Sequence, residues 1–98
     1  MTQENPILGR YVVVRTYSAG VHIGVLTHWA DKAVSLKEAR RIWSWKGANT
    51  LHEIAIRGVG TGSKVSEPVQ EVDLTEAVEV IGATDAAKDN LMAAKWGN

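Results

Sequence analysis

The chain has 98 residues, a formal net charge of zero and no cysteine. A chain of this length is expected to form one domain, residues 1–98, and to bury roughly 60–65% of the surface that it exposes when unfolded. Zero net charge excludes a strong overall field that would attract nucleic acid or an anionic membrane, and the lack of cysteine excludes disulfide and thiolate chemistry.

The first predicted elements form a β-hairpin. Residues 11–17, YVVVRTY, are typical of a half-buried strand, because β-branched and aromatic side chains fit a pleated surface. The segment SAG predicts a turn in which Gly20 can adopt a positive φ. Residues 21–29, VHIGVLTHW, predict the second strand, and a further extended run begins at residue 34.

Residues 35–47 fit two different structures. The motif SLKE has the spacing of a helix capping box, with Ser35 as N-cap and Glu38 three residues later. Aromatic residues and the need of the hairpin for a third strand favour a strand instead. We predict a strand over Arg40–Trp45. A period of two then places three residues on one face: Arg41, Trp43 and Trp45.

The second half of the chain predicts two helices and one more strand. Thr50 and Glu53 form a capping-box pair at the start of a short helix that ends at Gly58. The glycine- and serine-rich segment 58–68 predicts a flexible loop, and the alternating Val and Glu of residues 69–82 predict one strand with an acidic face. An alanine-rich C-terminal helix follows Thr84.

Together these elements predict an α+β fold: a small, mostly antiparallel β-sheet of four to five strands with one short helix and a C-terminal helix. An exposed strand edge, Leu91 and Met92 on the surface of the last helix, and Trp96 near the end of the chain all favour a homo-oligomer.

The basic, aromatic segment ARRIWSWKGANT, residues 39–50, is the strongest candidate for a binding site. Indole faces can stack on a base, and arginine side chains can bind its phosphate. The alternative is that both tryptophans fill a core that has no phenylalanine, while the arginines pair with the acidic residues of segment 71–79. The turn RTYSAGVH can also hold a phosphate or ribose, or simply connect two strands. The candidate ligand-binding residues are Arg15, Tyr17, Ser18, Arg40, Arg41, Trp43, Trp45, Lys46 and Asn49.

Other site chemistries are disfavoured by spacing. The segment GVGTGSK lacks the spacing of a phosphate-binding loop, and the three histidines have no ligand partner at metal-binding spacing. No nucleophile–base arrangement or paired acidic motif is present, so we expect no metal, no cofactor and no enzymatic activity.

Four segments in this order, VRTYSAGVHIGVL, ARRIWSWKGANTLHEIA, PV and LTEAVEVI, resemble a family of small proteins of tailed bacteriophages and prophages whose function is unassigned. The resemblance covers residues 10–82, and ARRIW-W-GA is its most distinctive part. It implies a viral accessory protein and carries over no catalytic residue. The polar start of the chain predicts no signal peptide, and no apolar run approaches the roughly 20 residues that cross a bilayer. We therefore expect a location in the host cytoplasm and no membrane partner.

Two functional hypotheses follow. The first is a phage-encoded sponge that binds and sequesters a nucleotide immune messenger, such as a cyclic dinucleotide or a cyclic ADP-ribose derivative, without converting it. The second is a protein-binding module that inhibits a host protein or assembles in the phage particle, with the tryptophans as interface anchors. A single-stranded nucleic acid is a disfavoured partner, because such binding depends on neutralising phosphates and the net charge is zero.

Overall fold

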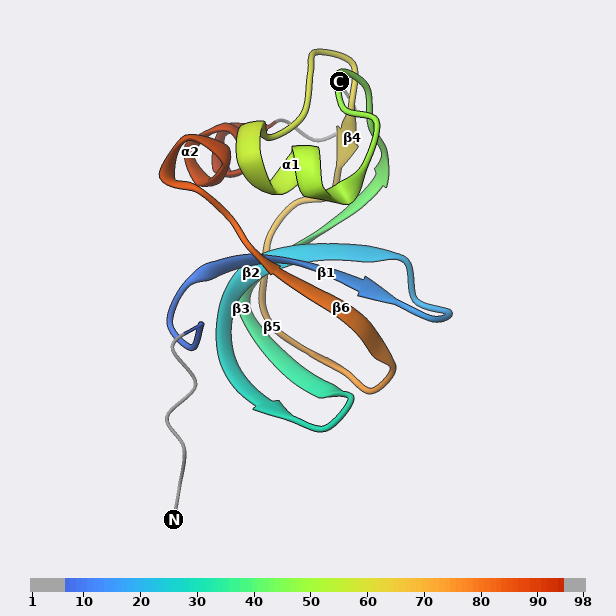
Figure 1. The fold of residues 1–98 in the computed structure, drawn as a ribbon, viewed down its shortest axis with the longest axis vertical. Coiled ribbons are helices and arrows are strands. Elements are labelled where there is room, and N and C mark those ends of the chain that lie inside the picture. The colour runs from blue at the N-terminus through green and yellow to red at the C-terminus, as the bar shows by residue number, and fades with distance from the viewer. Residues whose placement is uncertain (1–6, 95–98) are drawn as a thin grey trace.

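The computed structural model describes residues 7–94. It contains six strands and two helices, and Figure 1 shows their arrangement. In chain order they are β1 (Tyr11–Thr16), β2 (Val21–Ala30), β3 (Ala33–Ser44), α1 (Leu51–Arg57), β4 (Lys64–Val65), β5 (Val69–Leu74), β6 (Ala77–Gly82) and α2 (Asp85–Ala93). None of the helices in the described part of the chain has the length and apolar character that crossing a membrane requires.

The strands form one antiparallel sheet in the order β4-β3-β2-β1-β6, with β5 also paired to β3. The predicted α+β class is confirmed, and the sheet has six strands rather than four to five. The additional strands have two origins. Part of the predicted loop forms β4, and the acidic segment 69–82 forms two strands instead of one.

The connection between β5 and β6 requires the sheet to curl. Only Thr75 and Glu76 separate these strands, yet β5 pairs with β3 and β6 pairs with β1. In a flat sheet they would lie about 19 Å apart, whereas the three peptide steps between them span at most about 11 Å. The main-chain N–H of Ala77 also donates to Lys32 O at 2.9 Å, which joins the start of β6 to the β2–β3 turn. Figure 1 shows the resulting half-barrel in the lower part of the molecule.

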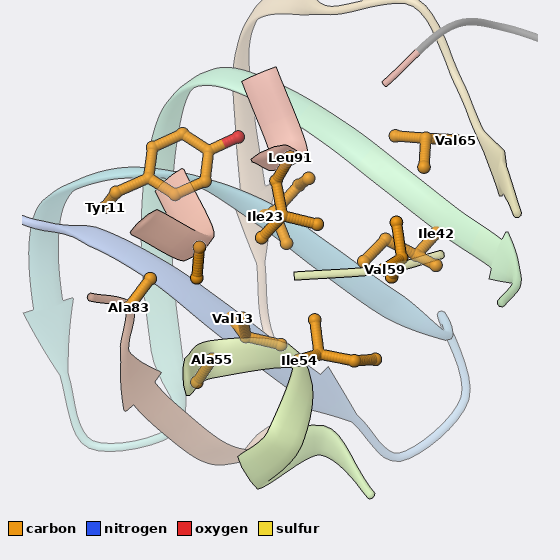
Figure 2. Close-up of a cluster of buried hydrophobic side chains, with 11 residues drawn as sticks. Tyr11, Val13, Ile23, Ile42, Ile54, Ala55, Val59, Val65, Ala83 and Leu91 are labelled. Carbon is orange, nitrogen blue, oxygen red and sulfur yellow. The ribbon is translucent and has the colours of Figure 1, made fainter. Parts of the chain in front are cut away.

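The curled sheet has an apolar core on each side. Because neighbouring side chains of a strand point to opposite faces, the consecutive Val12, Val13 and Val14 supply both cores, and each is fully buried. The prediction of a half-buried first strand was therefore wrong. The core inside the curl contains Val12, Val14, Leu26, Val34, Leu36, Ala39 and Leu74. The core beneath the helices, shown in Figure 2, contains Tyr11, Val13, Ile23, Ile42, Ile54, Ala55, Val59, Val65, Ala83, Ala87 and Leu91.

Both helices begin at the predicted residues. Thr50 Oγ1 accepts from the main-chain N–H of Glu53 at 3.3 Å, and Thr84 Oγ1 accepts from Ala87 N–H at 3.1 Å. On α2, Met92 is exposed as expected, but Leu91 is fully buried beneath the helix. Its predicted exposure was wrong, and Trp96 lies outside the described residues.

The ambiguous segment is a strand. β3 extends to Ser44, and the Ser35 hydroxyl donates to Asp73 Oδ1 at 2.8 Å instead of capping a helix. Glu38 interrupts the regular strand, since it adopts a left-handed φ of 53°. There the register with β2 shifts, because Val25 pairs with Lys37 and Ile23 pairs with Arg40. This bulge allows the two halves of β3 to serve different cores.

Candidate functional site

A concave pocket of about 470 Å³ lies where the end of β1, the start of β2 and the middle of β6 meet the start of α1. We call it the Trp45 pocket. It brings together three of the predicted site residues, Arg15, Trp45 and Asn49. The described residues that line it are Arg15, Val21, Trp45, Asn49, Thr50, Leu51, His52 and Glu79.

The apolar wall of this pocket comes from side chains that also support the core. Trp45 follows β3 directly, is half-buried, and packs against the cluster beneath the helices together with Val21 and Leu51. The Trp45 side chain thus packs against the core on one side and lines the pocket on the other. A supported aromatic surface of this kind is suited to stacking against a planar ligand.

The positive charge at the pocket comes from Arg15, near the end of β1. In the sheet its neighbours are Val21 on β2 and Glu79 on β6. Within residues 7–94 its exposed guanidinium forms no ion pair or hydrogen bond, while Glu79 faces His52 across 3.8 Å. Arg15 therefore keeps its donors for an anionic group, and arginine binds phosphate and carboxylate groups in a planar, two-point geometry.

The polar groups at the start of α1 are held by that helix. Asn49 Nδ2 donates to Glu53 Oε1 at 3.3 Å, and Thr50 caps the first turn. The Asn49 carbonyl oxygen and the exposed His52 ring remain at the pocket rim. The rim thus offers both donors and acceptors for the edge of a base or a ribose.

Arg40, a predicted site residue, does not reach this pocket. It is buried beneath α2, and its guanidinium donates to the main-chain carbonyls of Ser66, Leu91, Met92 and Ala94. The sequence predicted that Arg40 binds a ligand or pairs with an acidic side chain of segment 71–79. Neither is observed, because Arg40 lies outside the Trp45 pocket and donates to main-chain carbonyls. Its role in the fold is to hold the end of α2 on the sheet.

Arg41, Trp43 and Lys46 lie outside the Trp45 pocket. The Arg41 guanidinium lies against Gly20, and Lys64 Nζ is 5.7 Å from the centroid of the Trp43 ring, which is 52% exposed. The main-chain N–H of Lys46 donates to Ser63 Oγ at 2.8 Å. The predicted common face for Trp43 and Trp45 was wrong, because β3 ends at Ser44 and strand alternation ends with it.

The β1–β2 turn is a structured connection. The Ser18 hydroxyl donates to Glu76 Oε1 at 2.6 Å, and the Tyr17 main-chain N–H donates to Glu76 O at 2.9 Å. These bonds tie the turn to the β5–β6 link. The Tyr17 side chain is 81% exposed, so it is available to a partner but lies outside the Trp45 pocket.

His22 is the buried titratable group next to Arg41. Its Nε2 lies 2.9 Å from Ala19 O, and it lines a small cavity of about 160 Å³ together with Arg41. Burial lowers the pKa of His22 below its ordinary value of 6.5, the hydrogen bond to Ala19 opposes this shift, and the positive charge of Arg41 lowers the pKa further. His22 therefore favours the neutral form in the folded protein.

Five lining residues of the Trp45 pocket were not predicted: Val21, Thr50, Leu51, His52 and Glu79. Glu79 enters through the pairing of β6 with β1, which local sequence patterns do not specify. In residues 7–94 there is no group of three or more His, Asp or Glu side chains that could hold a metal ion.

The glycine-rich segment 58–63 lines a separate cavity of about 340 Å³ against α2. Asn90 holds this segment, because its Oδ1 accepts from Val59 N–H at 2.7 Å and its Nδ2 donates to Val59 O at 3.1 Å. Asn90 also lies close to Gly58, so a side chain at that position would collide with it. The segment is thus a clamped connection rather than the flexible loop that the sequence predicts.

Comparison with known proteins gives a family but no function. No curated protein matches the chain, and no solved structure matches it. A family described as a domain of unknown function (DUF6948) matches residues 9–91, which include every strand and helix bordering the Trp45 pocket. The chain is therefore a member of the DUF6948 family.

Proposed function

We propose that this protein binds a nucleotide-derived signal in the Trp45 pocket and sequesters it without converting it. The observation that carries the proposal is the position of Arg15, which has no ion-pair partner within residues 7–94 and lines the same pocket as the supported indole of Trp45. Stacking on an indole contributes about 1–3 kcal/mol per base, and a nearby guanidinium adds recognition of the phosphate.

The size and lining of the pocket support a ligand of this class. Its volume of about 470 Å³ lies within the range of roughly 300–1,000 Å³ that is usual for small-molecule sites. The Asn49 side chain and the His52–Glu79 pair at the rim can bind the polar edge of a base or a ribose hydroxyl. The proposed reaction is binding alone, so the protein would act in stoichiometric amounts.

The resemblance to small phage and prophage proteins supports a biological setting for this proposal. A viral protein in the host cytoplasm that holds a nucleotide immune messenger would lower its free concentration and block the defence that it activates. The proposed ligands are cyclic dinucleotides and cyclic ADP-ribose isomers, which combine planar bases with phosphates.

The test is direct measurement of binding. The purified chain is titrated by calorimetry with a panel of cyclic dinucleotides and cyclic ADP-ribose isomers, and bound ligand is released by heating and identified by mass spectrometry. We expect one ligand to bind, to raise the melting temperature and to be recovered intact. If no member of the panel binds, or if the ligand is recovered hydrolysed, the proposal is wrong.

Matched variants locate the site. Trp45→Leu and Arg15→Gln should each weaken binding by roughly tenfold or more, because they remove the stacking surface and the phosphate contact. Trp43→Leu and Arg41→Gln change the same residue types outside the pocket and should leave binding unchanged. Equal losses of nucleotide binding in both pairs of variants would contradict the Trp45 pocket and place the binding site on the β3 surface.

A second candidate function is protein binding through the edge of β6. Among the described strands β6 pairs only with β1, and its bulged residue Val78 is 59% exposed. An exposed edge of this kind can accept a strand from a host protein or from a second copy. Native mass spectrometry and capture from host lysate test this function. It would be favoured by one stoichiometric protein partner, no bound nucleotide, and loss of partner binding in Val78→Lys.

A further inference from the structure

Another cavity, of about 420 Å³, lies between β3 and the end of α2. Its lining residues are Tyr11, Glu38, Arg40, Pro68, Met92 and Ala94, and we call it the Tyr11 pocket. Tyr11 begins β1 and Arg15 lies near its other end, so the Tyr11 and Trp45 pockets occupy different parts of the molecule. Nothing in the proposed nucleotide binding uses the Tyr11 pocket.

The Tyr11 hydroxyl is the first unusual group of the pocket. The residue is only 4% exposed, and within residues 7–94 its oxygen is the buried side-chain atom that has no hydrogen-bond partner. Figure 2 shows this oxygen directed toward the side of Leu91 and α2, away from Val13 and Ala83. Burial raises the pKa of Tyr11 to about 12, so the hydroxyl keeps its proton and remains a donor. Buried polar groups in folded proteins are nearly always paired, which indicates that an additional group belongs here.

Arg40 supplies the second unusual feature, a buried cation. Of the five N–H groups of a guanidinium, four donate to main-chain carbonyls: Nε to Ser66, Nη1 to Leu91 and Met92, and Nη2 to Ala94. Within residues 7–94, one N–H of Nη2 has no acceptor and no carboxylate lies at ion-pair distance from Arg40. Tyr11 and Arg40 therefore bring to the pocket lining a positive charge and two donors that have no acceptor within residues 7–94.

Glu38 supplies the third feature, a carboxylate on an exposed residue of the lining. It has a left-handed φ of 53°, a conformation that is unfavourable for residues other than glycine. The bulge in β3 places Glu38 in the same lining as Tyr11 and Arg40. The negative charge of Glu38 raises the pKa of the Tyr11 hydroxyl, whereas the positive charge of Arg40 lowers the pKa of that hydroxyl. Unfavourable backbone conformations of this kind concentrate at binding sites, where they position a side chain.

These three features define the charge pattern of a ligand. A simple carboxylate would pair with Tyr11 and Arg40 but would be repelled by Glu38. A simple amine would pair with Glu38 and leave the buried donors unpaired. The other described lining residues, Pro68, Met92 and Ala94, are apolar. We propose that the Tyr11 pocket binds a small zwitterion of the amino-acid class, whose carboxylate accepts from the Tyr11 hydroxyl and the Arg40 Nη2–H and whose ammonium group faces Glu38. The apolar lining selects an aliphatic side chain.

The test uses the full chain labelled with ¹⁵N and three related probes. L-Leucine carries both charges, N-acetyl-L-leucine lacks the ammonium group, and isopentylamine lacks the carboxylate. We expect leucine alone to give saturable chemical-shift changes at the amides of Tyr11, Glu38 and Met92. Absence of saturable changes at about 10 mM leucine, or equal binding of N-acetyl-leucine, would overturn the proposal.

Two variants test the assigned contacts. Tyr11→Phe removes only a hydroxyl that has no partner within residues 7–94, so the fold should be retained while leucine affinity falls roughly tenfold. Glu38→Gln should weaken leucine binding and strengthen N-acetyl-leucine binding, because the repulsion of the carboxylate is lost. Tyr17→Phe removes an exposed hydroxyl in the β1–β2 turn and is the matched control. Unchanged leucine affinity in Tyr11→Phe and Glu38→Gln would refute the site, whatever the outcome of the nucleotide titrations.

Discussion

Arg40 Nη1 donates a buried hydrogen bond of 2.7 Å to the main-chain carbonyl of Leu91, fifty-one residues later in the chain. The carbonyls at the end of a helix lack partners within the helix, and the helix dipole makes that end negative. The last turn of α2 has no basic residue of its own. A side chain from the middle of β3 therefore provides the cation that this helix end requires.

We predict that Arg40→Met lowers the free energy of unfolding by about 2–4 kcal/mol, because it leaves several buried carbonyls without a donor. Urea unfolding followed by circular dichroism measures this loss. Arg41→Met is the matched control, since Arg41 is exposed, and its effect should stay within about 0.5 kcal/mol. Similar effects of the two substitutions would contradict the role assigned to Arg40.

Gly58 should be among the most sensitive glycines. It has a φ of +84°, and an added Cβ would lie 2.1 Å from Asn90 Oδ1, so Gly58→Ala combines backbone strain with a collision. We expect a loss of about 3 kcal/mol or more in thermal or urea unfolding. Gly9 has a similar φ of +86° and open space around it, so Gly9→Ala should cost only about 1 kcal/mol. The prediction fails if both substitutions cost the same.

Glu38→Gly should stabilise the fold. Relief of the left-handed conformation is worth about 1–2 kcal/mol, and the greater freedom of glycine in the unfolded chain offsets about half of it. We therefore expect a net gain of about 0.5–1 kcal/mol in the free energy of unfolding. Glu71→Gly, on the neighbouring strand β5, is the control and should cost about 0.5–1 kcal/mol, because its backbone needs no such relief. A destabilising Glu38→Gly would show that the side chain supports the fold.

His22 should make the stability depend on pH. Because its pKa is lowered in the folded state, the unfolded chain takes up the proton first as the pH falls below the ordinary value of 6.5. Stability should thus be constant above this pH and fall as the pH drops from 6.5 toward the lower pKa of the folded state. Urea unfolding at about pH 7.5 and 5.5 measures the difference.

Two variants test whether His22 causes this pH dependence of stability. His22→Gln should flatten it, since the amide can still donate to Ala19 O but does not titrate in this range. Arg41→Gln should raise the pKa of His22 toward its ordinary value in an NMR titration. The exposed His28 provides the comparison, and a dependence that follows His28→Gln instead would exclude His22 as the cause.

Local patterns predicted the elements of this fold well. The turn at Gly20, the caps at Thr50 and Thr84 and the strand through Arg40 all depend on residues within a few positions of one another, and the structure confirms each. The split of segment 69–82 into two strands was missed, because its Val and Glu alternation is continuous across the link at Thr75. Only the non-local pairing of its halves with β3 and β1 separates them.

The candidate site was harder to predict for the same physical reason. Arg15, Trp45 and Asn49 were predicted as ligand-binding residues, but their grouping depends on the packing of α1 against β1 and β6. The local sequence did not indicate whether Arg40 or Arg41 would be buried. That outcome depends on the carbonyls of α2, whose position no local pattern specifies.

The pairing of β1 with β6 has a consequence for folding during synthesis. The pairing of Val12 with Gly82 joins the first described strand to the last, so this ladder cannot form until residue 82 has left the ribosome. The helices cannot act as early nuclei, because seven and nine residues fall short of the roughly 12 that an isolated helix needs in water. Acquisition of the native state therefore follows translation of residue 82, with the slow kinetics of long-range strand pairing.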